Sequence, residues 1–210
     1  MGKINIPLLL LVLSVVAVVE SSTSRLRPHS TFIETQCRRT RYPEPCVTFL
    51  SKFVNPTSQD PQEIAQAALK VSLVRALHTK AYIAKVCKEP KTMKAKDYQA
   101  IKECFVHISH GVSQLKNAVK ELHNLKLDGQ LEEFLWHQNN VQTWLSTVLT
   151  DAYTCMDGLS GYSKGGKVKA TIKAKVLNVA QFTSNALALF NGFAARYKTS
   201  HHASYDNNKP

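Results

Sequence analysis

Four segments of this chain carry apolar residues at intervals of three and four, and this spacing restricts the possible folds more than any other feature. In the clearest segment, which begins at Asp97, the apolar positions are Ile101, Cys104 or Phe105, Ile108, Val112, Leu115, Val119 and Leu122. Such spacing puts the apolar side chains on one face of an α-helix, where neighbouring helices can cover them. The segment is therefore predicted to be one long helix of a bundle.

The other three helices are predicted from the same spacing. One runs from Pro61 to about Glu89, with Asp60 as its N-cap and Pro90 as its stop. The next follows a short segment around Phe134 and carries Val141, Leu145, Val148, Ala152, Cys155 and Leu159. The last carries Ile172, Val176, Val179, Phe182, Ala186, Leu189 and Phe193. Four such helices with short connections predict an all-α fold, an antiparallel up-down four-helix bundle over residues 59–197.

The regions outside the bundle have distinct compositions. Lys3, an apolar run over residues 8–19 and small polar residues after Glu20 indicate a secretory signal peptide over residues 1–24. The alternative is an uncleaved anchor, but the run is shorter than the roughly 20 residues that span a membrane. We therefore expect a secreted, extracellular protein without a membrane span. Residues 25–58 are predicted to form an N-terminal helical hairpin, and residues 198–210 a disordered tail.

Secretion makes the five cysteines informative, because disulfides persist in oxidising compartments. They are Cys37, Cys46, Cys87, Cys104 and Cys155. The proline-rich stretch CRRTRYPEPC favours a turn, so its two cysteines are expected to staple the hairpin. Cys104 and Cys155 lie on the apolar faces of consecutive helices and could pair, although a Cys87–Cys104 bridge competes with that pairing. The odd count leaves at least one thiol without a partner in the chain.

The chain is strongly basic, with a formal net charge of +12. Such a charge attracts polyanions, which for a secreted protein include acidic polysaccharides. The densest cluster is a candidate polyanion-binding patch made of Lys164, Lys167, Lys169, Lys173 and Lys175. The alternative interpretation of this cluster is a solvated loop and helix face.

No arrangement of catalytic residues is recognisable in the sequence. No serine lies in a nucleophile elbow, and KGGK lacks the spacing of a phosphate-binding loop. His107 and His110 share a helix face but lack the glutamate and third ligand of a zinc site, so we interpret their spacing as chance. His78 lies on an apolar stripe and is expected to be a core or interface residue. The sequence predicts a protein that is not an enzyme and needs no metal or cofactor.

Several motifs together resemble the plant invertase/pectin methylesterase inhibitor family. They are a C-x8-C hairpin ending in YPEPC, KEC on one helix, NVQTWLSTVLTDAYTCMDG on a later helix, and KVLNVAQFTSNALAL. The resemblance covers about residues 30 to 196. It implies a four-helix bundle with an N-terminal hairpin and the disulfides Cys37–Cys46 and Cys104–Cys155. Many members have a fifth cysteine in the last helix, whereas here the remaining thiol is Cys87.

The resemblance also implies a function. The stretch QTWLSTVLTDAYTCMDG is similar to the region that precedes the catalytic domain in many plant pectin methylesterases, and a Pro-Lys-Phe tripeptide typical of some invertase inhibitors is absent. Both features favour pectin methylesterase as the target, inhibited non-covalently by the exposed faces of helices 61–89 and 97–125. De-esterified pectin is a second expected partner, and nucleic acid is not expected. The alternatives are an inhibitor of acid invertase and a basic, pectate-binding wall protein without an enzyme target.

Overall fold

The computed structural model describes residues 31–89, 94–127, 130–160 and 166–207, and these residues form helices without any strand. A short hairpin comprises α2 (Thr31–Cys37) and α3 (Pro43–Leu50). Four long helices follow: α4 (Pro61–Cys87), α5 (Ala95–Asn124), α6 (Leu131–Gly158) and α7 (Lys167–Asn207). The prediction of an all-helical fold is confirmed.

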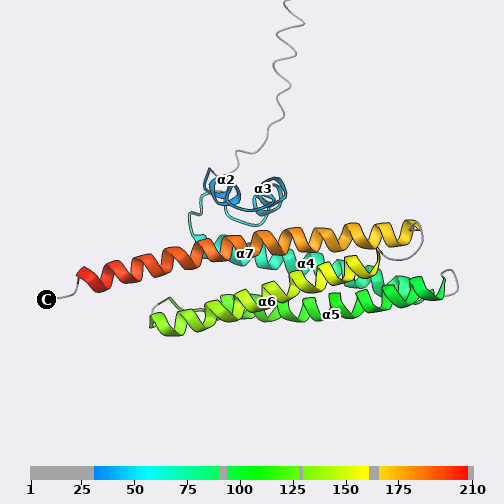
Figure 1. Cartoon of the computed structure of the whole chain (residues 1–210). Helices are drawn as coiled ribbons and strands as arrows, with labels where there is room; N and C mark the ends of the chain where they lie inside the picture. The colour runs from blue at the N-terminus through cyan, green and yellow to red at the C-terminus, as the bar shows by residue number, and fades with distance from the viewer. Residues whose placement is uncertain (1–30, 90–93, 128–129, 161–165, 208–210) are drawn as a thin grey trace, which may run out of the picture.

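The four long helices form an antiparallel bundle in which each helix packs against two others. Helix α4 packs against α5 and α7, and α6 packs against the same two helices from the opposite corner. Figure 1 shows α4 and α7 on one side of the bundle and α5 and α6 on the other, with the hairpin above α4 and α7. The hairpin therefore lies outside the bundle, on one of its long faces.

Most of the predicted apolar positions are buried in the core, which also includes residues outside those positions. One buried cluster lies around the inter-helix disulfide and includes Ile83, Ile101, Ile108, Ala152, Ile172 and Val176. A larger cluster extends from the bundle into the hairpin and includes Ile33, Leu50, Leu69, Leu115, Leu145 and Phe190. Because the hairpin shares its apolar side chains with the bundle, the described residues form one folding unit.

An asparagine side chain of α7 forms two hydrogen bonds to the backbone of the hairpin. The amide of Asn185 accepts a hydrogen bond from the backbone N–H of Tyr42 at 3.1 Å and donates one to the Tyr42 carbonyl at 2.7 Å. Asn185 is buried, and loss of either bond would leave a buried polar group without a partner. A second connection joins Arg196 of α7 to Gln36 of α2, with 3.2 Å between the guanidinium and the side-chain oxygen.

Two helix boundaries differ from the prediction. Helix α6 begins at Leu131 and includes the segment around Phe134, which the sequence separates from the helix. The reason is long-range packing: the Phe134 ring stacks on Tyr197 with 4.0 Å between ring centroids and meets Phe193 edge-on at 6.0 Å. Helix α7 continues to Asn207, although the sequence predicts a disordered tail from residue 198. No proline or glycine interrupts residues 193–207, and the Tyr197 hydroxyl donates to the Leu127 carbonyl at 3.2 Å.

The predicted signal peptide, residues 1–24, lies outside the described residues. Within the described ranges, none of the helices is long and apolar enough to cross a bilayer.

The two disulfides are expected to contribute unequally to stability. Cys104 and Cys155 are 51 positions apart in sequence, whereas Cys37 and Cys46 are nine apart. Loop-closure entropy then predicts losses of about 4 and about 3 kcal/mol in the free energy of unfolding when each pair is replaced by alanine. Urea unfolding of C104A/C155A and C37A/C46A, followed by circular dichroism, measures both losses. The reverse order of stability would contradict this prediction.

Candidate functional site

The four cysteines assigned to disulfides by the family resemblance are bonded in that pairing. The Cys37–Cys46 bond joins α2 to α3 with 5.6 Å between Cα atoms. The Cys104–Cys155 bond joins α5 to α6 with 4.4 Å between Cα atoms. Both bonds are buried, so they fix helix positions and present no reactive group to a partner.

Cys87 is a free thiol at the C-terminal end of α4. Its side chain is partly buried, and burial raises the pKa of the thiol above its ordinary value. The positive charge of Lys102 on α5 acts in the opposite direction but is the smaller effect. Cys87 is therefore less ionised at neutral pH than an exposed cysteine.

The predicted lysine patch is not a single surface feature. Lys169 is 5% exposed, and its ammonium group forms an ion pair with Asp97 of α5 at 2.8 Å. It therefore joins α7 to α5 inside the structure and does not belong to a solvent-exposed patch. Lys173 donates to the Ser160 hydroxyl at 2.8 Å, and the Lys175 ammonium lies 5.0 Å from the centroid of the Tyr82 ring. Lys167 is exposed at the start of α7, and Lys164 lies outside the described residues.

His107 and His110 both contact one carboxylate, a shared partner that the sequence did not predict. The Nδ1 atom of His107 lies 3.1 Å from one oxygen of Asp151, and that of His110 lies 2.8 Å from the other. Asp151 is on α6 and is buried, so the cluster connects α5 to α6 next to the disulfide. Among the described residues, no group of three or more His, Cys, Asp and Glu side chains is placed to hold a metal ion.

A second histidine–carboxylate cluster connects the same two helices near the other end of the bundle. The Nδ1 atom of His137 on α6 lies 2.8 Å from the Glu121 carboxylate on α5, and Asn140 donates to the same oxygen at 3.1 Å. Beside it, Trp136 is 61% exposed and meets the His137 ring edge-on. Polar contacts thus hold the outer faces of α5 and α6 in a fixed relative position, with a large aromatic side chain on the surface.

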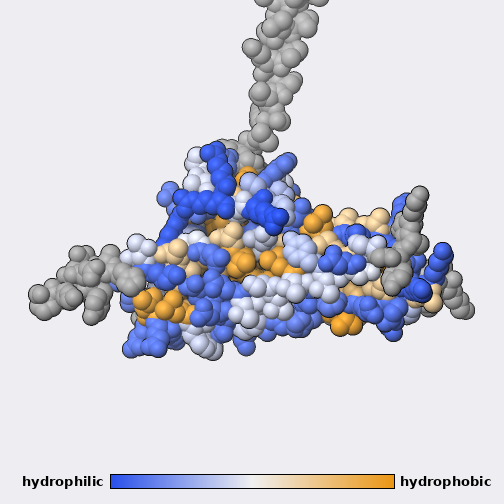
Figure 2. Space-filling view, viewed as in Figure 1, coloured by the Kyte–Doolittle hydropathy of each residue, from blue (hydrophilic) through white to orange (hydrophobic). Residues whose placement is uncertain are grey.

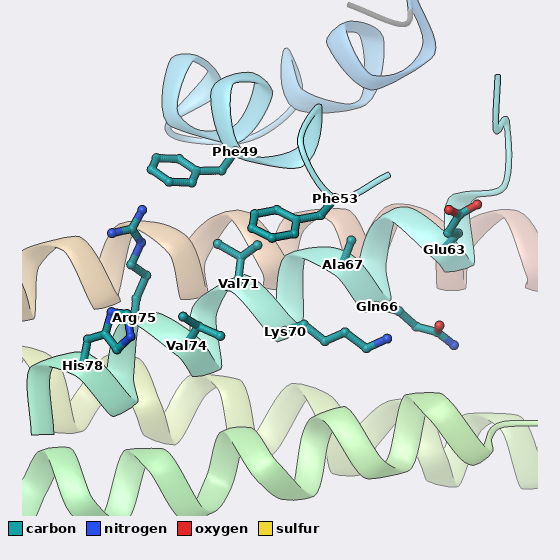
Figure 3. Close-up of a pocket in the computed structure, with 10 residues that line it drawn as sticks. All are labelled: Phe49, Phe53, Glu63, Gln66, Ala67, Lys70, Val71, Val74, Arg75 and His78. Atoms are coloured by element: carbon teal, nitrogen blue, oxygen red, sulfur yellow. The ribbon is translucent and has the colours of Figure 1, made fainter. Parts of the chain in front are cut away.

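An open groove of about 400 Å³ lies between the hairpin and α4. Figure 3 shows Phe49 and Phe53 on the hairpin side, facing Val71 and Val74 of α4. In Figure 2 the hairpin surface is largely hydrophilic, and apolar atoms appear where it meets the bundle.

Basic residues stand at one end of this groove. The Arg75 guanidinium lies 4.2 Å from the centroid of the Phe49 ring and 5.2 Å from that of Phe182. Both aromatic rings therefore stabilise its positive charge. His78 is exposed at the edge of the groove, so of the two predicted roles it does not have that of a core residue, and that of an interface residue stays a prediction.

The positions of the buried polar residues in the sequence are a signal for these contacts. Asp97 precedes Ile101 by four positions, and Lys169 precedes Ile172 by three, so both continue an apolar stripe. Asp151 and Asn185 also stand at core spacing within α6 and α7. A polar residue at a core position of a helix needs a partner, and here each has one on another element.

Comparison with known proteins agrees with this geometry. Residues 31–189 match the model of the plant invertase/pectin methylesterase inhibitor family. The chain belongs to this family. It is 42% identical to pectinesterase inhibitor 9 of Arabidopsis thaliana, over 91% of this chain and 95% of the relative. It is 38% identical to a 21 kDa protein of Daucus carota, over 90% and 96% of the two chains.

The fold is also shared with a solved structure of a family member. A crystal structure of a mutant form of a pectin methylesterase inhibitor from Arabidopsis superposes with a TM-score of 0.60 at 18% sequence identity. The match covers 77% of this chain and 97% of the other. At this identity the comparison supports the fold.

The Lys169–Asp97 ion pair provides a test of the buried contact between α7 and α5. Replacing Lys169 with methionine leaves the Asp97 carboxylate without its cationic partner. We expect a loss of about 3 kcal/mol in the free energy of unfolding. This value is at the lower end of the range for a broken buried ion pair, because the Asp97 side chain keeps some contact with solvent. The D97N/K169M double variant should recover part of this loss. Equal stability of K169M and the unchanged protein in urea would contradict the prediction.

The raised pKa of Cys87 predicts slow alkylation. Because the thiolate is the reactive form, iodoacetamide should react with folded protein more slowly at pH 8 than with the urea-unfolded chain, and the rate should rise only at higher pH. Lys102→Gln should slow the reaction further, since it removes the charge that lowers the pKa. Lys116→Gln, also an exposed lysine of α5, is the control. A faster reaction in K102Q would show that the assigned cause is wrong.

Proposed function

We propose that this protein is a secreted inhibitor of plant pectin methylesterase that binds the enzyme reversibly, without a covalent bond and in a 1:1 complex. The observation that carries this proposal is the 42% identity to pectinesterase inhibitor 9 over 91% of the chain. The inhibitor occludes the pectin-binding cleft of the enzyme and thereby regulates the demethylesterification of cell-wall pectin. It acts outside the cell, in the apoplast, without catalytic residues of its own.

The exposed faces of α4 and α5 are the proposed contact surface, and we extend it to the adjoining face of α6. Val106 of α5 is 64% exposed, Trp136 of α6 is 61% exposed and Tyr153 of α6 is 42% exposed. Large aromatic side chains are enriched among the residues that contribute most to binding at protein interfaces. The histidine–carboxylate clusters keep α5 and α6 in one relative position, which supports tight binding because a preorganised surface loses little entropy on docking.

Methanol release from methylated pectin tests the inhibition. We expect adding this protein to a plant pectin methylesterase to stop methanol release at a stoichiometric ratio, while acid invertase assayed in parallel keeps its activity. Inhibition of invertase alone would assign the chain to the other branch of its family. Full activity of both enzymes, across several methylesterase isoforms, would contradict the proposed function.

Matched variants test the contact surface. Trp136→Ala and Val106→Arg should each raise the inhibition constant by about tenfold or more, because loss of a central interface side chain costs about 2 kcal/mol or more. Leu77→Arg tests the exposed face of α4 in the same way. Phe53→Ala is the control, since Phe53 is 65% exposed but lies on the hairpin side of the molecule. If only the control weakens inhibition, the contact surface is the hairpin.

A further inference from the structure

A second groove, open and of about 690 Å³, lies between α4 and the first turns of α7. It adjoins the apolar groove beneath the hairpin, and Arg75 and His78 line both. Figure 3 shows these two side chains at the end of the apolar groove opposite Glu63. The second groove therefore begins where the apolar surface ends.

The side chains that line the second groove are basic or neutral. Arg75 and His78 contribute from α4, and Lys167 and Lys175 contribute from α7, whereas none of the described lining residues is acidic. Lys167 and Lys175 are eight positions apart on one helix, a distance of about 12 Å along its axis.

Two of these cations are held in place without an acidic partner. Arg75 is stacked against Phe49 and Phe182, and Lys175 lies over the Tyr82 ring. None of the ion pairs formed among the described residues involves either side chain. Aromatic contacts thus fix the two cations while their N–H donors stay available to an anion.

The neutral residues of the groove favour a sugar over a bare anion. Thr171 and Asn178 of α7 line it between and beside the lysines and offer a hydroxyl and an amide. Such groups can hydrogen-bond the hydroxyls of a sugar, while the cations bind its carboxylates.

We propose that this groove binds a linear polyuronate, a polysaccharide chain with a carboxylate on each sugar. The choice of this polyanion rests on the proposed function, because hydrolysis of methyl esters on pectin leaves a chain of free carboxylates. Arg75, Lys167 and Lys175 pair with successive carboxylates, and Thr171 and Asn178 contact hydroxyls. The groove holds the inhibitor on de-esterified regions of the substrate of its target enzyme. This site replaces the five-lysine patch expected from the sequence, since Lys169 is buried and Lys173 does not line the groove.

Isothermal titration of the mature chain with a size-fractionated oligogalacturonate tests the proposal at constant ionic strength. K167Q/K175Q should weaken binding by at least about tenfold, because each charge-assisted hydrogen bond contributes roughly a factor of ten. K116Q/K120Q on α5 is the control with the same net charge and exposed positions, and it should bind within about twofold of the unchanged protein. Arg75→Lys should give an intermediate loss, because lysine keeps the charge but not the planar donors of the guanidinium.

Two further ligands test whether the groove recognises carboxylates and whether it recognises a sugar. The fully methyl-esterified oligomer should not bind measurably, and polyglutamate of similar charge should bind more weakly than the oligogalacturonate. If K167Q/K175Q and K116Q/K120Q lose the same amount of affinity, binding depends on net charge alone and the proposed groove is refuted. Equal binding of polyglutamate would overturn the choice of a sugar.

The binding assay contains no enzyme, so it separates this site from the inhibitory function. K167Q/K175Q should still inhibit methylesterase on a short methylated substrate. Failure of inhibition by the unchanged protein would refute the proposed function, whereas failure to bind oligogalacturonate would refute only the groove.

Discussion

The close packing of α5 against α6 is the constraint on which the rest of the structure depends. The Cys104–Cys155 bond brings the two helices to 4.4 Å between Cα atoms, and Asp151 adds a polar connection to His107 and His110 beside it. Once this pair is fixed, α4 and α7 can cover its remaining apolar face, and Lys169 of α7 reaches Asp97 of α5. The bundle is thus held by a covalent bond and by buried charges as well as by apolar packing.

The sequence was sufficient to predict the helices and the bundle, because apolar spacing is a local property that burial then selects. It was not sufficient for features that depend on where distant residues meet. The start of α6 is set by Phe134 stacking on Tyr197, 63 positions away in the chain. The lysine patch failed as a prediction for the same reason, since Lys169 is adjacent in sequence to exposed residues but lies over Asp97 in the fold. The pairing of Cys104 with Cys155 came from the family resemblance, not from spacing alone.

Different faces of the molecule carry different kinds of side chain. The outer faces of α5 and α6 carry histidine–carboxylate clusters and exposed aromatic residues, whereas the face formed by α4, α7 and the hairpin carries the apolar and basic grooves. Inhibition by binding, as proposed above, needs surfaces of fixed shape. The disulfides and the buried ion pair provide that fixed shape.

The contact between Asn185 and Tyr42 has a consequence for how this protein can evolve. Asn185 recognises the backbone N–H and carbonyl of Tyr42 and makes no use of the tyrosine ring in these two bonds. Mutations that change side chains in the bend between α2 and α3 therefore leave this attachment in place. Outward-facing side chains of the bend can therefore change without breaking these two bonds, whereas replacing Asn185 would break both at once.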